Sequence, residues 1–108
     1  MKIVGVSACV AGIAHTYVVK ERLISTAQKR GHQIHIETQG VVGQENKIPD
    51  NAIEEADVVI LATDVSISGR DRFIGKRIIE VPTKTVVQNC EALIKKIEDL
   101  LMEEKQNE

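Results

Sequence analysis

Residues 2–16 read KIVGVSACVAGIAHT, and this stretch decides the fold. Its first part, Lys2 to Ser7, is a short apolar run of the kind that forms a buried strand. Small residues follow from Ala8 to Ala14, after which apolar residues recur at helical intervals as far as Gly31. The stretch therefore predicts a strand, a tight loop and a helix in direct succession.

Three more strands are predicted farther along the chain. Apolar and polar residues alternate from His32 to Thr38, which is typical of a strand with one polar face near a sheet edge. The run Asp57 to Thr63 is apolar throughout its middle, as expected where helices cover both faces of a parallel sheet. A brief strand from Arg77 to Val81 is closed by Pro82.

The remaining segments carry loop and helix signals. Gly40 to Pro49 is predicted to be a loop, and Asn51 with Glu54 has the spacing of a capping box that opens a short helix. Asn89 is predicted to cap the final helix, which has an apolar stripe and ends in a charged, fraying tail over residues 103–108.

Strands that alternate with helices predict a single three-layer α/β domain over residues 1–108. The sheet would have four parallel strands in the order 2-1-3-4, with helices on both faces. In such sheets ligands bind beyond the carboxyl ends of the strands, where the strand order reverses. We therefore expect the site between the loop after the first strand and the loop that begins at Thr63 and Asp64.

Composition excludes several classes of function. The 108 residues include one Tyr, one Phe and no Trp, so stacking on bases or sugar rings cannot be the main binding device. The formal net charge of -2 gives no general attraction for nucleic acid or anionic lipid. No segment approaches the ~18 consecutive apolar residues of a membrane span. Two distant cysteines do not make a disulfide framework, which favours a cytoplasmic protein.

The loop after the first strand combines a thiol with a potential anion site. Gly12 and its small neighbours allow successive backbone N–H groups to converge, and the N-terminus of the following helix adds positive potential. That potential, to which His15 would add, favours a thiolate at Cys9. A nucleophile beside an anion pocket indicates phosphoryl capture. The alternative is that Cys9 is a small buried residue in a tight turn, as we expect for Cys90 on the apolar face of the last helix.

His15 bears on the type of reaction. It lies six positions after Cys9, where a cysteine phosphatase loop of the C-x5-R type would carry arginine. Arginine grips phosphate with a planar fork that histidine cannot reproduce, so His15 favours relay of a phosphoryl group over its hydrolysis. His15 could also point into solvent at a helix N-terminus, and Thr16 could be either a phosphate donor or a local cap.

Other residues carry weaker signals. The basic stretch from Gly69 to Arg77 could meet an acidic partner or a phosphoryl group, or could be a solvated face. Asp64 could orient a loop, carry a proton or cap a helix. His32 and His35 would face opposite sides of a strand, so no metal site is predicted. The chain has no G-x-x-x-x-G-K-[ST] or G-x-G-x-x-G motif, and no cofactor is predicted.

These residues together resemble the IIB component of the fructose class of the bacterial sugar phosphotransferase system. The resemblance rests on the loop CVAGIAHT from Cys9 to Thr16, on ETQG from Glu37 to Gly40, on Asp64, and on Arg72-Phe73 with Gly75-Lys76. The family's loop usually reads CPTGIAHT. Val10 and Ala11 depart from it, and Ala11 lacks a hydroxyl that could contact the phosphoryl group.

The resemblance implies a protein-phosphohistidine-sugar phosphotransferase that works through phosphocysteine. Cys9 would take a phosphoryl group from a phosphohistidine of a IIA partner and pass it to fructose or a related sugar in the membrane-embedded IIC transporter. Gln39, Asp64 and Arg72 would support the site. The chain would be held at the inner face of the membrane through IIC. The phosphoryl-binding residues would be Val10, Ala11, Gly12, Ile13, Ala14, His15 and Thr16.

Two other classes of function remain open at this point. One is a cysteine phosphatase of related fold, in which water releases phosphate from Cys9. The other is a non-catalytic regulatory module, in which Cys9 need not react.

Overall fold

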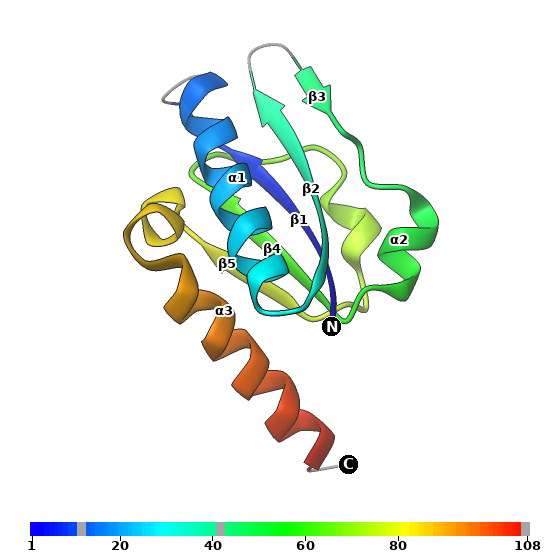
Figure 1. Cartoon of the computed structure of the whole chain (residues 1–108). Coiled ribbons are helices and arrows are strands. Elements are labelled where there is room, and N and C mark those ends of the chain that lie inside the picture. The colour runs from blue at the N-terminus through cyan, green and yellow to red at the C-terminus, as the bar shows by residue number, and fades with distance from the viewer. Residues whose placement is uncertain (11–12, 41–42, 107–108) are drawn as a thin grey trace.

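A computed structural model describes residues 1–10, 13–40 and 43–106. Figure 1 shows a central sheet with α1 and α3 against one face and α2 against the other. The expected three-layer α/β architecture is therefore confirmed. The elements are β1 (Lys2–Ala8), α1 (Ile13–Lys29), β2 (Gln33–Gly40), β3 (Gly43–Glu45), α2 (Asp50–Glu55), β4 (Val58–Thr63), the 3-10 helix η1 (Arg70–Phe73), β5 (Ile78–Val81) and α3 (Thr83–Gln106).

The sheet has five strands in the order β3-β2-β1-β4-β5. The pairs β2-β1, β1-β4 and β4-β5 are parallel, whereas β3 runs antiparallel to β2. The expected sheet of four parallel strands in the order 2-1-3-4 is thus wrong in strand number and in direction, and its order lacks the antiparallel edge strand β3. The error lies in the segment 40–49, where the three residues of β3 are too few for their periodicity to show.

Alternation along β1 builds a core on each face of the sheet. Ile3 packs with residues of α1 and α3, whereas Val4 and Val6 pack with residues of α2 and η1. Gly5 lies between these positions, and a Cβ added there would stand 2.5 Å from the carbonyl oxygen of Ile60. That oxygen belongs to the backbone of the neighbouring strand β4 and cannot move aside. Only glycine therefore fits at this point of the central strand.

Two helix starts differ from the prediction. Pro49 is the N-cap of α2 and makes no side-chain cap hydrogen bond, so the capping box expected at Asn51 is wrong. Helix α3 begins at Thr83, and the backbone of Asn89 is non-helical inside it, with φ -160° and ψ 75°. The Oδ1 atom of Asn89 accepts a hydrogen bond of 3.1 Å from the N–H of Ala92. Asn89 therefore caps the second segment of α3, not its beginning.

Helix α3 also extends into the segment where a fraying tail is expected. It continues to Gln106, so residues 103–106 of the predicted tail are helical, and residues 107–108 lie outside the described part of the chain. The segment from Asp64 to Gly75 contains the short helix η1.

Candidate functional site

Cys9 directly follows β1, the strand that lies between β2 and β4. Its Sγ atom is 3.2 Å from Oγ1 of Thr16, and both side chains are buried. The hydroxyl of Ser7 donates a 3.1 Å hydrogen bond to the carbonyl oxygen of Thr16, which ties the end of β1 to the first turns of α1. The thiol is therefore held at the carboxyl end of a central strand, where the sequence predicts a site.

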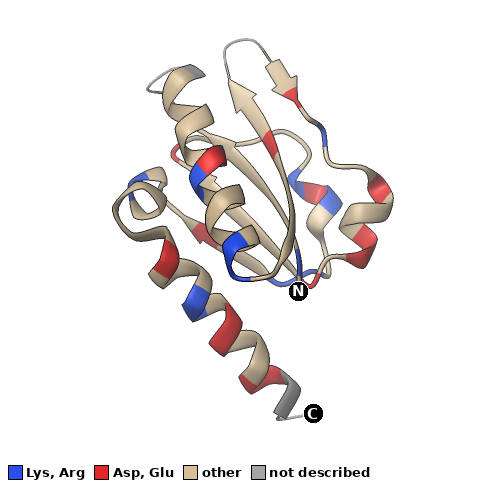
Figure 2. Cartoon of the chain, in the orientation of Figure 1, with Lys and Arg blue, Asp and Glu red and all other residues tan. Residues whose placement is uncertain are grey.

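The N-terminus of α1 lies close to this thiol in the chain. The helix begins at Ile13 and has no acidic residue in its first turn, and Figure 2 shows that end of α1 without acidic colouring. The partial positive charge of the helix end is thus not offset by carboxylates of its own first turn. Val10 is 81% exposed, and Ala14 is also exposed.

The middle of the predicted loop cannot be compared with the prediction. Ala11 and Gly12 lie outside the described residues, and Ile13 is placed only as the first residue of α1. The expected convergence of backbone N–H groups falls largely on these residues.

A second set of contacts joins α1, the end of β4 and the start of α3. The Nε2 atom of His15 is 3.1 Å from Oγ1 of Thr83. Thr83 donates to Asp64 twice, from its hydroxyl to Oδ2 at 2.5 Å and from its backbone N–H to Oδ1 at 3.0 Å. The structure thus brings the predicted residues His15 and Asp64 together through a third residue.

These contacts also fix the charge of Asp64. The hydrogen bonds from the Thr83 side chain and backbone lower the pKa of Asp64 below its ordinary value, and the nearby His15 acts in the same direction. An ionised Asp64 accepts both hydrogen bonds, and one of them satisfies an N–H at the start of α3. Asp64 therefore acts as a cap and as an orienting group.

Thr83 is the site residue that the sequence analysis missed. It is 2% exposed and is separated from His15 by 68 positions in the chain. The available signal was its place directly after Pro82, since proline is common just before or at a helix start and threonine caps helices. The stronger cap signal at Asn89 masks it, because that signal predicts a later start for the same helix.

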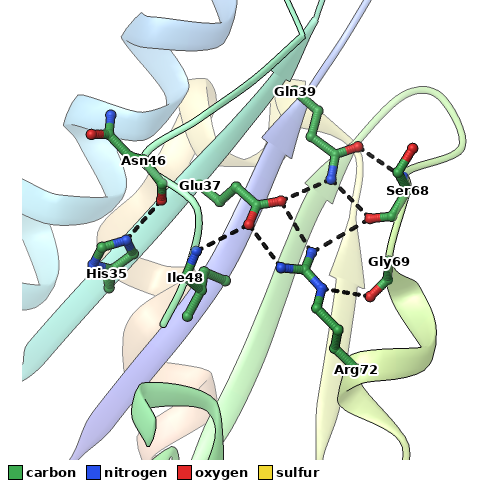
Figure 3. A network of polar contacts seen from close by, with 8 residues as sticks. All are labelled: His35, Glu37, Gln39, Asn46, Ile48, Ser68, Gly69 and Arg72. Atoms are coloured by element: carbon green, nitrogen blue, oxygen red, sulfur yellow. Dashed lines mark hydrogen bonds and ion pairs between the residues drawn. The ribbon is translucent and has the colours of Figure 1, made fainter. Parts of the chain in front are cut away.

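Gln39 and Arg72 belong to a different network, shown in Figure 3. Its centre is Glu37, which is fully buried. Arg72 donates from Nη1 to Oε1 of Glu37 at 2.8 Å and from Nη2 to Oε2 at 3.0 Å. Gln39 donates to Oε2 at 2.8 Å, and the N–H of Ile48 donates to Oε1 at 3.1 Å. Burial opposes the charge of Glu37, but these hydrogen bonds outweigh it and lower the pKa of the carboxyl.

The same two side chains hold the loop that follows β4. The amide of Gln39 accepts from the N–H of Ser68 at 2.8 Å and donates to its carbonyl oxygen at 2.9 Å. Arg72 donates from Nε to the carbonyl oxygen of Gly69 at 2.7 Å. The network packs on the α2 side of the sheet, because Ile48 belongs to that core, whereas Thr16 lies on α1 at the other face. Gln39 and Arg72 are thus engaged in a clamp on this loop.

The remaining cations of the basic stretch are also engaged within the chain. Arg70 lies 3.1 Å from Glu80, and Arg77 lies 2.6 Å from Glu104. The ammonium of Lys76 donates to the carbonyl oxygens of Glu54 at 2.6 Å and Ala56 at 3.2 Å, at the end of α2. These pairings favour a structural interpretation of the stretch.

Cys90 contrasts with Cys9 in its surroundings. It is 5% exposed, and its thiol is 3.6 Å from the carbonyl oxygen of Arg22. Burial raises the pKa of the Cys90 thiol. It belongs to the core between α1 and α3, as predicted.

Among residues 1–10, 13–40 and 43–106, no group of three or more His, Cys, Asp or Glu side chains is arranged to hold a metal ion. Within the same part of the chain, no helix has the length and apolar character needed to cross a membrane.

Comparison with known families identifies the family of the chain. The model of the family described as "PTS system, Lactose/Cellobiose specific IIB subunit" matches residues 4–96. The chain belongs to the PTS IIB family. The expected resemblance is therefore confirmed, and phosphotransferase activity is the general activity of this family.

Relatives of this IIB chain are of the fructose type. It is 41% identical over 97 residues to the "PTS system fructose-like EIIB component 2" of Escherichia coli K12, with 90% of this chain and 92% of the relative covered. It is 41% identical over 100 residues to the "PTS system fructose-specific EIIB component" of Haloferax volcanii, with 93% and 63% covered. A "Fructose-like PTS system EIIBC component" of Escherichia coli K12 matches over 90% of this chain but only 20% of its own length. The chain is thus a IIB component of the fructose type.

Solved structures of IIB domains share the fold. A domain of the fructose-specific IIABC component of Borrelia burgdorferi has a TM-score of 0.82 at 44% identity, with 87% of this chain and 89% of that chain covered. The enzyme IIB subunit of Escherichia coli K12 has a TM-score of 0.90 at 30% identity, with 96% of each chain covered.

Proposed function

We propose that Cys9 is the phosphoryl carrier of this IIB domain. The Sγ atom accepts a phosphoryl group from a phosphohistidine of a IIA partner and passes it to a hydroxyl of fructose or a related sugar bound to IIC. The observation that carries the proposal is the position of Cys9, since its thiol lies at the carboxyl end of central strand β1 and contacts Thr16 of α1.

Each half of the transfer exchanges one bond to phosphorus. In the first half, the Cys9 thiolate attacks phosphorus, the S–P bond forms and the N–P bond to histidine breaks. In the second half, the sugar oxygen attacks phosphorus, its proton is released and the thiolate leaves. The positive end of α1 favours the anionic phosphoryl group during both halves.

The absence of an arginine fork in the loop distinguishes carrier from phosphatase. His15 stands where a C-x5-R loop carries arginine, and Arg72 is engaged with Glu37 on the other side of the sheet. The transition state of hydrolysis is therefore poorly stabilised at Cys9. This favours storage of the phosphoryl group over its hydrolysis.

The partners are inferred from how related domains are joined. Relatives named EIIBC components contain a segment similar to this chain within a longer protein, and one structural relative is a domain of a IIABC component. We infer that this domain docks alternately on a IIA donor and on a membrane IIC acceptor, at the inner face of the membrane. The exposed Val10 next to Cys9 would be part of the contact.

The test is an intact-mass measurement of the chain after incubation with phosphoenolpyruvate, the upstream relay proteins and candidate IIA partners. We expect one phosphoryl increment in the wild type and in Cys90→Ala, and none in Cys9→Ser. Cys90→Ala is the matched control because it removes the other thiol, which is buried in the core.

Three outcomes would overturn parts of the proposal. A label that persists in Cys9→Ser assigns the carrier to another residue. Continuous release of inorganic phosphate from the labelled chain in the absence of IIC identifies a phosphatase. An unlabelled wild type whose IIC-dependent function survives in Cys9→Ser identifies a regulatory module.

A further inference from the structure

Thr83 joins two site residues that come from different parts of the chain. His15 lies in the first turn of α1, Asp64 follows β4, and Thr83 is the first residue of α3. The Oγ1 atom of Thr83 lies 3.1 Å from Nε2 of His15 and 2.5 Å from Oδ2 of Asp64. Thr83 is 2% exposed, so water does not compete freely for its hydroxyl. Three elements therefore meet at one hydroxyl group.

The single proton of that hydroxyl sets the direction of both contacts. An ionised carboxylate only accepts hydrogen bonds, so the hydroxyl proton of Thr83 points to Asp64. The low pKa of Asp64 keeps it ionised at neutral pH. The oxygen of Thr83 then has only lone pairs to offer to His15, and the proton between them belongs to Nε2.

We infer that Thr83 is a positioning residue that, oriented by Asp64, accepts the hydrogen bond from Nε2–H of His15 and leaves Nδ1 as the nitrogen that can donate to a phosphoryl group at Cys9 when the ring carries both protons. This inference rests on the proposed function for the identity of the ligand. The orientation itself stands on the three side chains.

The chemical value of the arrangement is a fixed ring. An unconstrained imidazole exchanges its proton between two nitrogens and rotates, whereas a ring held at one nitrogen offers the other in a single direction. Within residues 1–10, 13–40 and 43–106, the contact with Thr83 is the hydrogen bond that His15 makes. Losing it would free the ring to turn away from the loop.

The tautomer of His15 provides a test that does not depend on phosphoryl transfer. Nitrogen-15 spectra of the labelled full chain, recorded where the rings are neutral, should show His15 with its proton on Nε2. The His15 signals are assigned by their loss in His15→Gln, since His32 and His35 also contribute.

Asp64→Asn should reverse the tautomer. Its amide oxygen still accepts from the Thr83 N–H, so its NH2 group faces the hydroxyl and donates to it. The hydroxyl must then donate to Nε2, which moves the ring proton to Nδ1. An Asp64→Asn chain whose His15 keeps the wild-type tautomer, or a wild type protonated at Nδ1, overturns the inference.

Substitutions of Thr83 link the orientation to the reaction. Thr83→Val, which keeps the shape but removes the hydroxyl, should slow phosphorylation of Cys9 about tenfold, the factor that one ordinary hydrogen bond supplies. Thr83→Ser should restore most of the rate. Thr85→Val is the matched control, because it makes the same change two positions farther along α3.

The outcomes separate this inference from the proposed function. If Thr83→Val, Thr83→Ser and wild type are labelled at the same rate, the positioning role is wrong although Cys9 remains the carrier. If the tautomer reverses in Asp64→Asn but wild-type Cys9 takes no phosphoryl group, the orientation holds and the proposed function fails. If Thr83→Val does not fold, the tautomer of His15 in Asp64→Asn still decides.

Discussion

At the residue scale, Glu37 shows that a sequence pattern can predict a polar strand position without predicting its burial or its partner. The alternation in β2 predicts a polar face, but the structure buries the Glu37 side chain completely and neutralises it with Arg72. The two residues are 35 positions apart, and no periodicity links them. A buried carboxylate needs both the charge and the full set of hydrogen bonds that this network supplies.

The residues of the candidate site also fall into two groups, those that local sequence predicts and those that only the fold brings together. Cys9, His15 and Thr16 fall within one short loop and helix start, so the strand-loop-helix pattern was sufficient to place them together. Thr83 reaches His15 only through the fold, and Arg72 could be assigned to the clamp on Glu37 only after the fold was known. Local motifs therefore predict the nucleophile, whereas the residues that orient its surroundings depend on distant contacts.

Arg72→Ala should destabilise the chain strongly. It leaves the fully buried Glu37 charged without a counterion, which costs about 3–5 kcal/mol in the free energy of unfolding. Urea denaturation measures the loss. Arg70→Ala is the control, because Arg70 and Glu80 are each about half exposed and such a pair contributes roughly 0–1 kcal/mol. Equal midpoints for the two variants would show that the network does not stabilise the fold.

The elements differ in how well local signals predict them. Strands β1 and β4 and helix α1 have long apolar patterns, and the structure contains all three near the expected bounds. Strand β3 has three residues and is defined by its pairing with β2, which no local pattern reveals. Helix α3 has two consecutive starts, and the cap signal of Asn89 in the sequence hides the earlier start at Thr83.

Two asparagines allow a matched test of helix capping. Asn89→Ala removes the side-chain oxygen that accepts from the Ala92 N–H and should cost about 1 kcal/mol of stability. Asn51→Ala makes the same change at the exposed position where the sequence suggested a cap, but Pro49 is the N-cap there. It should leave the free energy of unfolding nearly unchanged.

Thermal or urea unfolding of both variants measures the difference. A loss in Asn51→Ala as large as that in Asn89→Ala would contradict the assignment of the caps.

In the whole molecule, the candidate site and one cluster of stabilising charged residues lie at different ends of the sheet. The site lies at the carboxyl ends of the parallel strands. Near the start of β2, Arg30 and His32 both contact Glu98, which joins the end of α1 to α3. Arg30 lies 2.8 Å from each oxygen of Glu98, and His32 lies 2.6 Å from Oε2. Hydrogen bonds from Arg30 and then His32 lower the pKa of Glu98 from 4.5 to about 2.

This carboxylate gives the fold a predicted pH dependence. Because the folded pKa lies below the unfolded value, the stabilisation is present above about pH 4.5 and is lost as the pH falls toward 2. Solvent screening at this partly exposed group limits the effect to about 1 kcal/mol. Glu98→Gln should therefore be less stable than wild type at neutral pH, and the two should converge near pH 2.

Urea denaturation at a series of pH values measures this convergence. Glu91→Gln is the control, because Glu91 is largely exposed and lies 3.6 Å from Arg30. A Glu98→Gln chain that keeps a constant difference from wild type between pH 6 and about pH 2 would contradict the assignment.

The two outer strands of the sheet have a consequence for behaviour at high local concentration. Strand β3 has three residues and β5 has four, and β5 carries the exposed Glu80. A second chain could form only a few backbone hydrogen bonds at either edge, and would meet a carboxylate on each strand, since β3 ends in Glu45. Crowding of such domains would thus favour encounters through side-chain surfaces over aggregation by strand addition.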